Sequence, residues 1–142
     1  MKNKNNLFLS LVAWACALGA TLGSLYFSEI AHFPPCTLCW YQRIAIYPLV
    51  FIIPLAIIRK DTQFPYSVLS VTIPGLLVSA YHNLLYYGLI PEQLAPCTAG
   101  VSCTTKYIEW FGFVTIPLLS LLILLVITLC MVALIRNQQN HE

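Results

Sequence analysis

Charged side chains are scarce in this chain. Lys, Arg, Asp and Glu make up 8% of its 142 residues, whereas hydrophobic residues make up 59%. An ordinary soluble domain carries about 25% charged residues, so seven basic and five acidic side chains are too few to form a water-soluble surface of this size. The composition therefore excludes an ordinary soluble domain. We expect a lipid bilayer as the surroundings and no nucleic-acid partner, while the net charge of +2 says little about the partner protein.

The few charges are clustered, and long uncharged stretches separate them. No Lys, Arg, Asp or Glu occurs in residues 7–28, 44–58, 64–91 or 110–135. A membrane-spanning helix needs roughly 20 apolar residues. The pattern predicts an all-α integral membrane protein, with a four transmembrane helix bundle in a single membrane domain over residues 1–142. The helices are expected at about 7–29, 40–58, 66–87 and 110–135, and two short outer loops at about 30–39 and 88–109.

The first segment lacks the features of a cleaved signal peptide. Two lysines give it a basic start, but its apolar run over residues 7–27 exceeds the usual h-region of about 7–15 residues, and no A-x-A-like cleavage site follows. We therefore expect this helix to remain in the mature protein. Ala15, Gly19 and Gly23 are spaced four residues apart, which predicts close packing against another helix of the bundle.

Basic residues are distributed unevenly between the two sides of the predicted bundle. Lys106 falls on one side, together with Arg43 near a helix end. The other side has five basic residues: Lys2, Lys4, Arg59, Lys60 and Arg136. Because lysine and arginine concentrate in cytoplasmic loops, we expect a multi-pass protein of the cell membrane with both termini in the cytoplasm. The two loops that follow the first and third helices then face outward.

The six cysteines fall into two classes under this topology. Cys16 and Cys130 lie within apolar helices, where free cysteine behaves as a small apolar residue. The other four lie on the outer side, where thiols tend to be oxidised and paired cysteines favour disulfides. These four are Cys36, Cys39, Cys97 and Cys103.

The motif Cys36-Thr-Leu-Cys39 opens the second predicted helix. Two prolines precede it, so the helix is expected to begin at Cys36 or Thr37. Unpaired backbone N–H groups at a helix start favour a thiolate at Cys39. Arg43 follows about 6 Å further along the axis, where its permanent charge can stabilise that thiolate. An ionisable residue at this depth is costly, which makes Arg43 a candidate functional residue.

Cys97 and Cys103 enclose five residues of the second outer loop. A disulfide here would close a short loop and contribute about 2–3 kcal/mol, so a structural staple and a redox pair are equally compatible with the spacing. A dithiol at a helix end and a second dithiol in a loop can exchange a disulfide by thiolate attack. The first pair therefore favours redox chemistry for both.

Arg43 also lies at a depth that a lipid-soluble electron acceptor can reach. Quinones partition into the bilayer, and their reduction develops negative charge on oxygen, which a buried arginine stabilises. His82 falls toward the outer end of the third predicted helix, from where it can donate a proton or a hydrogen bond. The alternative is a histidine that only packs within the bundle or lies at the interface.

Two other classes of protein are compatible with four outer cysteines. A metal-binding membrane protein would use them as a closed set of four zinc ligands, although the positive charge of Arg43 would repel a cation beside the first pair. A structural membrane protein would use both disulfides only to hold its loops. A protein similar to vitamin K epoxide reductase is disfavoured, because here the Cys-x-x-Cys motif precedes the loop pair.

Residues 35–43, Pro-Cys-Thr-Leu-Cys-Trp-Tyr-Gln-Arg, resemble the signature of the DsbB family of disulfide bond formation proteins. Residues 23–29 and 110–117 are similar to its short BdbC-type branch, and the resemblance covers nearly the whole chain. It implies a four-helix membrane bundle that reoxidises a thioredoxin-like extracytoplasmic thiol oxidase and passes the electrons to a membrane quinone. The short branch favours menaquinone over ubiquinone.

The resemblance also implies a role for each residue of the first pair. Cys39 would form the thiolate that engages the quinone, with Arg43 beside it and His82 near the quinone. Cys36 would be the partner of Cys39 and would exchange with the outer loop.

In the second pair, the resemblance makes Cys97 the target of the partner's reactive thiolate. Cys103 would then attack the first pair and form a transient Cys36–Cys103 bridge. Longer members of the family place a small surface helix between these two cysteines, whereas only five residues intervene here. The division of roles between Cys97 and Cys103 is therefore left open.

Overall fold

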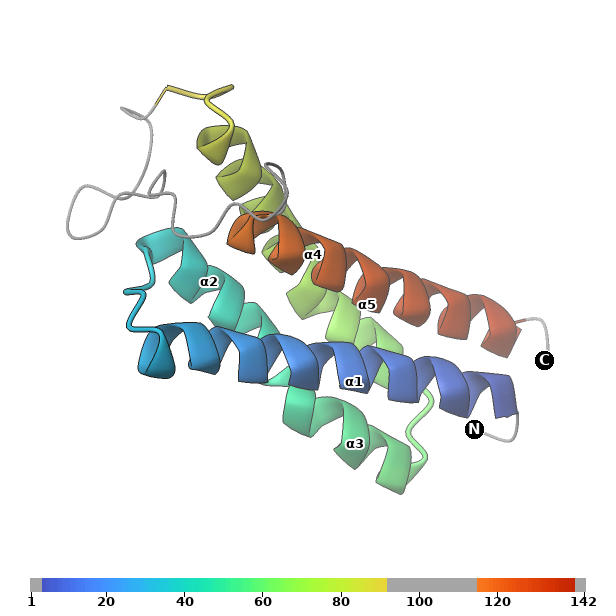
Figure 1. Cartoon of the computed structure of the whole chain (residues 1–142). Coiled ribbons are helices and arrows are strands. Elements are labelled where there is room, and N and C mark those ends of the chain that lie inside the picture. Colours follow the sequence, from blue (N-terminus) through green and yellow to red (C-terminus); the bar gives the residue numbers. More distant parts are fainter. Residues whose placement is uncertain (1–3, 92–114, 140–142) are drawn as a thin grey trace.

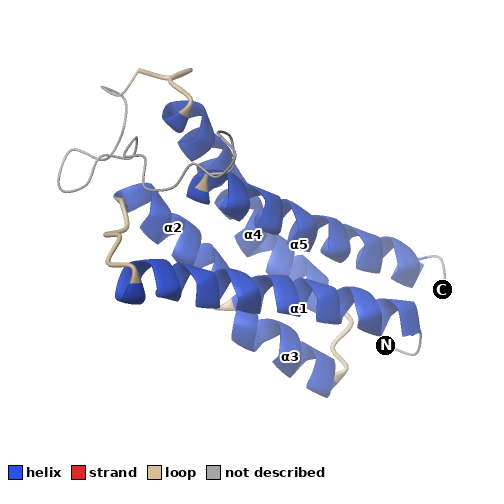
Figure 2. Ribbon diagram, in the orientation of Figure 1, coloured by secondary structure: helices blue, strands red, loops and turns tan. Residues whose placement is uncertain are grey.

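The regular structure of this chain is helical wherever the computed structural model describes it, in residues 4–91 and 115–139 (Figures 1 and 2). Four segments of 23–27 residues are long and apolar enough to cross a membrane. The chain is therefore an all-α, multi-pass membrane protein, as its composition predicts. Its helices are α1 (Lys4–Leu25), which continues into a π-helical turn (Tyr26–Ile30), α2 (Thr37–Ile46), α3 (Leu49–Arg59), α4 (Phe64–Tyr86) and α5 (Ile116–Gln139).

The second membrane span is a broken helix. It begins at Thr37, as the two prolines before Cys36 predicted and three residues before the apolar span expected at 40. Helices α2 and α3 are separated at Tyr47 and Pro48. Proline has no N–H to donate and its ring disfavours a continuous helix, which accounts for the break. The predicted start of the last helix at 110 and most of the second outer loop lie outside the described residues.

Pro54, inside α3, leaves the carbonyl of Val50 without its usual helical donor. The indole Nε1 of Trp14, on α1, donates a hydrogen bond of 3.1 Å to that carbonyl. An unpaired backbone group is costly inside a bilayer. A side chain of α1 therefore compensates for a proline of α3, and the contact ties the two helices together.

Helix α5 packs against α1 and α4, while α2 lies on α4 and α3 on α1. The N-terminus of α1 and the C-terminus of α5 lie at the same end of the bundle (Figure 1). There, Asn137 donates a hydrogen bond of 3.2 Å from Nδ2 to Oδ1 of Asn6. An even number of spans places both termini on the same side, as observed here.

The predicted packing role of the small-residue row on α1 is wrong. A Cβ atom added to Gly19 or Gly23 would meet no atom within 4 Å, and Ala15 is exposed. The fully buried alanines of α1 are instead Ala13 and Ala17. Their four-residue spacing is the same, but they belong to the face of α1 that contacts the apolar core.

Candidate functional site: a thiol pair at the head of an apolar cavity

Cys36 caps the N-terminus of α2. Its backbone is extended (φ −73°, ψ 170°), and its sulfur accepts a hydrogen bond of 3.4 Å from the backbone N–H of Cys39. The preceding prolines favour this extended approach. An N-cap residue normally accepts such a bond through a side-chain oxygen, so a sulfur in this place receives the same stabilisation when it is ionised.

The surroundings of Cys36 lower the pKa of its thiol from 9.0 to about 4. The hydrogen bond with the Cys39 side chain is the largest cause, and contacts with His82 and with the Cys39 backbone N–H act in the same direction, against burial. The sequence predicted that the helix start would favour a thiolate at Cys39. In the structure the helix-terminal N–H points to Cys36, because the helix begins one residue after it.

The two sulfur atoms of the motif lie close together. Sγ of Cys36 is 3.1 Å from Sγ of Cys39, and the side chains are buried and half-buried respectively. A disulfide bond is about 2.05 Å long, so an approach of about 1 Å joins them. The pair can therefore interconvert between dithiol and disulfide with little movement of the helix.

His82 of α4 faces this pair. Its side chain is 1% exposed, and its Nε2 lies 3.8 Å from Sγ of Cys36. On the other side of the ring, Nδ1 lies 3.0 Å from Nε2 of Gln42. The structure thus brings together two helices and three residues that the sequence had singled out, Cys36, Cys39 and His82.

Several polar residues of the site were missed by the sequence analysis. Gln42 is 5% exposed, and its Oε1 accepts a hydrogen bond of 2.7 Å from Ser120 of α5. Tyr47, directly after α2, donates a hydrogen bond of 3.3 Å from its hydroxyl to that of Ser24 on α1. A signal was present, because polar side chains are costly inside apolar spans. Which of them converge depends on helix rotation, which the sequence does not give.

Cys36, Cys39 and His82 also form a potential set of metal ligands, with their donor atoms all within 4.8 Å of one another. Two sulfur ligands of a tetrahedral zinc ion, each about 2.3 Å from the metal, would lie roughly 3.8 Å apart. The observed separation of 3.1 Å is shorter, and Arg43 contributes a positive charge to the same cavity. The geometry suits a dithiol better than a metal centre.

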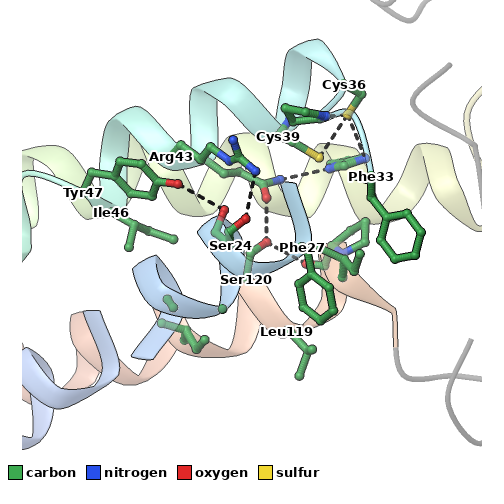
Figure 3. A pocket seen from close by; sticks show the side chains of 18 of the residues that line it. Ser24, Phe27, Phe33, Cys36, Cys39, Arg43, Ile46, Tyr47, Leu119 and Ser120 are labelled. Carbon is green, nitrogen blue, oxygen red and sulfur yellow. Dashed lines mark hydrogen bonds between the residues drawn. The ribbon is translucent and has the colours of Figure 1, made fainter. Parts of the chain in front are cut away.

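An apolar cavity of about 240 Å³ extends from the thiol pair into the bundle. Within it, Arg43 donates a hydrogen bond of 3.2 Å to the carbonyl of Ser24. The guanidinium carbon of Arg43 lies 5.2 Å from the ring centroid of Trp40. Figure 3 shows Cys36, Cys39 and Arg43 in succession along α2, with the ring of Phe27 near Leu119 across the cavity. Apolar walls include Phe27, Phe33, Ile46, Leu119 and Ile123.

Of the remaining four cysteines, the structure describes Cys16 and Cys130, and both lie within apolar helices as predicted. Cys130 is buried, and Cys16 packs against the apolar core beside it. Cys97 and Cys103 lie outside the described residues, so their pairing stays a prediction.

The fold and the site together define a helical membrane protein with a close thiol pair at the start of one span and an apolar cavity beneath it. Residues 5–134 match the family model described as "Disulfide bond formation protein DsbB". The chain belongs to this family, as its signature residues indicated.

Similar proteins cover almost the same length. The chain is 46% identical over 130 residues to "Disulfide bond formation protein C" of Bacillus subtilis, covering 90% of this chain and 94% of that protein. It is 43% identical over 130 residues to "Probable disulfide formation protein C" of Halalkalibacterium halodurans, covering 92% and 95% of the two chains. No solved structure matches this chain significantly.

Proposed function

We propose that this chain is a quinone-dependent protein-dithiol oxidoreductase that generates disulfides for exported proteins. In this proposal it reoxidises a thioredoxin-like extracytoplasmic partner and delivers the electrons to the membrane quinone pool, with menaquinone favoured. The observation that carries the proposal is the shared cavity. Cys36, Cys39 and Arg43 all line one apolar space within the bundle.

The cavity fits the ring of a quinone in size and chemistry. At about 240 Å³ it is slightly smaller than typical ligand sites of roughly 300–1,000 Å³, so it would hold a headgroup and leave an isoprenoid tail in lipid. Arg43 would donate to one polar edge of such a ring. His82 would donate to the other edge when Cys36 is held in the disulfide and its sulfur is no thiolate. When bound, a quinone supplies an acceptor for two electrons and two protons.

The residues of the chain would transfer the disulfide in two exchanges. The partner's thiolate attacks the Cys97–Cys103 disulfide and leaves the loop as a dithiol, while the partner is oxidised. A loop thiolate, assigned to Cys103, then attacks Sγ of Cys36, and Cys39 leaves as a thiolate beside Arg43. Cys97 attacks Cys103 in the resulting Cys36–Cys103 bridge, which restores the loop disulfide and releases Cys36 as a thiolate. The lowered pKa of Cys36 stabilises the reduced pair, which makes the Cys36–Cys39 disulfide a stronger oxidant of the loop.

The proposal includes an orientation. Both termini lie at one end of the bundle, and the loop between α3 and α4 lies at the same end (Figure 1). Arg59 ends α3 and Lys60 begins that loop. The positive-inside rule assigns this end to the cytoplasm. The thiol pair, at the opposite end, then faces the oxidising side of the membrane, where its partner is expected.

Thiol counting in intact cells tests the proposal. Cells that express a Cys16→Ala, Cys130→Ala background are acid-quenched, and free thiols are counted by a maleimide mass shift, with quinone synthesis active or blocked. We expect four oxidised cysteines with quinone and four reduced cysteines without it. Disulfides that persist without quinone would make the pairs structural. Thiols that are free under both conditions would indicate metal ligation or a cytoplasmic location.

A single substitution tests whether Cys39 is the residue that passes electrons to quinone. Cys39→Ser is expected to abolish quinone reduction by purified protein, while the second loop still traps the partner as a mixed disulfide. Turnover with quinone in Cys39→Ser would contradict the assignment.

A further inference from the structure

A chain of buried polar side chains joins three helices behind the thiol pair. Ser120 of α5 bonds to Gln42 of α2, Gln42 to His82 of α4, and His82 approaches Cys36 at the start of α2. Ser79 of α4 extends the chain, with its hydroxyl 3.1 Å from that of Ser120. His82, Gln42 and Ser79 are 1%, 5% and 0% exposed. Hydrogen bonds in such dry surroundings are strong and polarise one another.

The amide of Gln42 gives this chain a direction. The single hydroxyl proton of Ser120 has two acceptors within reach, Oε1 of Gln42 at 2.7 Å and the carbonyl of Pro117 at 2.9 Å. With the proton on the shorter contact, Oε1 of Gln42 accepts, and Nε2 is the atom that faces His82 Nδ1 at 3.0 Å. An amide nitrogen only donates, and Nδ1 must therefore accept. A neutral imidazole that accepts at one nitrogen carries its proton on the other. The proton of His82 then lies on Nε2, the atom nearest Cys36.

We propose that Gln42 is a positioning residue that holds His82 as the Nε2–H tautomer, so that the ring donates a hydrogen bond to the Cys36 sulfur. The idea rests on the proposed function, because a thiolate at Cys36 matters only if the pair undergoes exchange. Gln42 would act through His82 rather than on the sulfur itself. Ser120 would contribute by fixing which end of the amide faces the ring.

The opposite orientation of the Gln42 amide would reverse the role of His82 toward Cys36. If the amide were turned around, its oxygen would accept from Nδ1–H, and Nε2 would accept a proton from the Cys36 thiol. His82 would then act as a base toward Cys36 instead of a donor. Other ionisable groups on the surrounding elements are Cys39 and Arg43 of α2, Tyr47 directly after it, and Tyr81 and Tyr86 of α4. All of these except Tyr81 line the same cavity.

Nitrogen-15 NMR of histidine-labelled, reduced protein in lipid nanodiscs reads the tautomer directly. The chain has three histidines, and the His82 signals are assigned by their loss in His82→Phe. We expect a protonated Nε2 and an unprotonated Nδ1 for His82. Gln42→Leu should give a mixture of the two tautomers, and Gln42→Glu, whose carboxylate only accepts, should protonate Nδ1. Gln63→Leu, at an exposed glutamine, should change nothing.

A second readout links the tautomer to the thiol. The pH midpoint of Cys36 alkylation in the reduced protein should rise in Gln42→Leu and at least as much in His82→Phe, and should be unchanged in Gln63→Leu. A protonated Nδ1 in the unsubstituted protein, or Gln42→Leu with unchanged tautomer and alkylation midpoint, would overturn the inference. Neither readout involves quinone, so such a failure is separate from a failure of the proposed function.

Discussion

Gly75 of α4 lies against Ala45 of α2 so closely that a Cβ atom added to the glycine would be 2.9 Å from the Cβ of the alanine. Real Cβ atoms do not approach to that distance. The contact allows the backbones of the two helices to come together, one to two turns below the level at which Gln42 and His82 meet. The site therefore depends on the absence of a side chain at a position that takes no part in its chemistry.

Gly75→Ala is expected to destabilise the protein, because the added methyl group has no space and Ala45 cannot rotate out of its way. Overpacking of this kind typically costs about 1–3 kcal/mol. Thermal unfolding in detergent measures the effect. Gly19→Ala is the matched control, since its Cβ would meet nothing within 4 Å. Equal stability of the two variants would contradict the close α2–α4 contact.

The reactivity of Cys36 should persist at acidic pH. Its thiol pKa is lowered to about 4, so the sulfur is ionised above that value and becomes protonated as the pH falls through it. The rate of alkylation, followed by peptide mass mapping of the reduced protein, is expected to be nearly constant from about pH 6 to 8, because the thiolate is the reactive form. A midpoint near 9 would show that the neighbouring groups do not stabilise the thiolate.

Cys39→Ala should move that midpoint upward, because it removes the hydrogen bond that lowers the pKa of Cys36 most. His82→Phe should move it in the same direction by a smaller amount. The two midpoints are measured by the same alkylation assay. A larger shift in His82→Phe than in Cys39→Ala would reverse the order of the two causes.

Arg43→Ala is expected to weaken quinone binding more than disulfide exchange. A hydrogen bond from a charged group contributes about 1.5–3 kcal/mol, which corresponds to a rise of roughly 10-fold or more in the apparent KM for quinone. The rate of mixed-disulfide formation with the partner serves as the internal control. Arg43→Lys should be intermediate, since it keeps the charge but loses the planar donor group. An unchanged KM in Arg43→Ala would remove Arg43 from the quinone site.

Trp14→Phe should lower the free energy of unfolding more in the natural chain than in a Pro54→Ala background. With Pro54 present, loss of the indole donor leaves the Val50 carbonyl buried and unpaired, at a cost of about 1–3 kcal/mol. Alanine at 54 restores a backbone donor and makes the indole dispensable. A double-mutant cycle of unfolding free energies measures this coupling. Additive effects would show that Trp14 stabilises the bundle only by packing.

The four spans could be predicted from the sequence because they depend on composition over about 20 residues. The motif around Cys36 and Cys39 was also visible, since a helix start, two cysteines and Arg43 are neighbours along the chain. Helix rotation was harder to predict. On α1, the row containing Gly19 looked like a packing face, yet the row of Ala13 and Ala17 is the buried one. In a nearly uniform apolar segment, the pattern of side chains hardly distinguishes one face from another.

By itself the sequence determined that this protein spans a membrane, that a thiol pair opens one span and that Arg43 follows one turn below. These properties are local, because they follow from hydrophobicity and from spacing along a single helix. Only the tertiary structure decided that the helix-terminal N–H points to Cys36, that Gln42 and Ser120 lie behind His82, and that a cavity runs past Arg43. Each of these requires two or three helices at a particular separation and rotation, and that geometry results from the packing of the whole bundle.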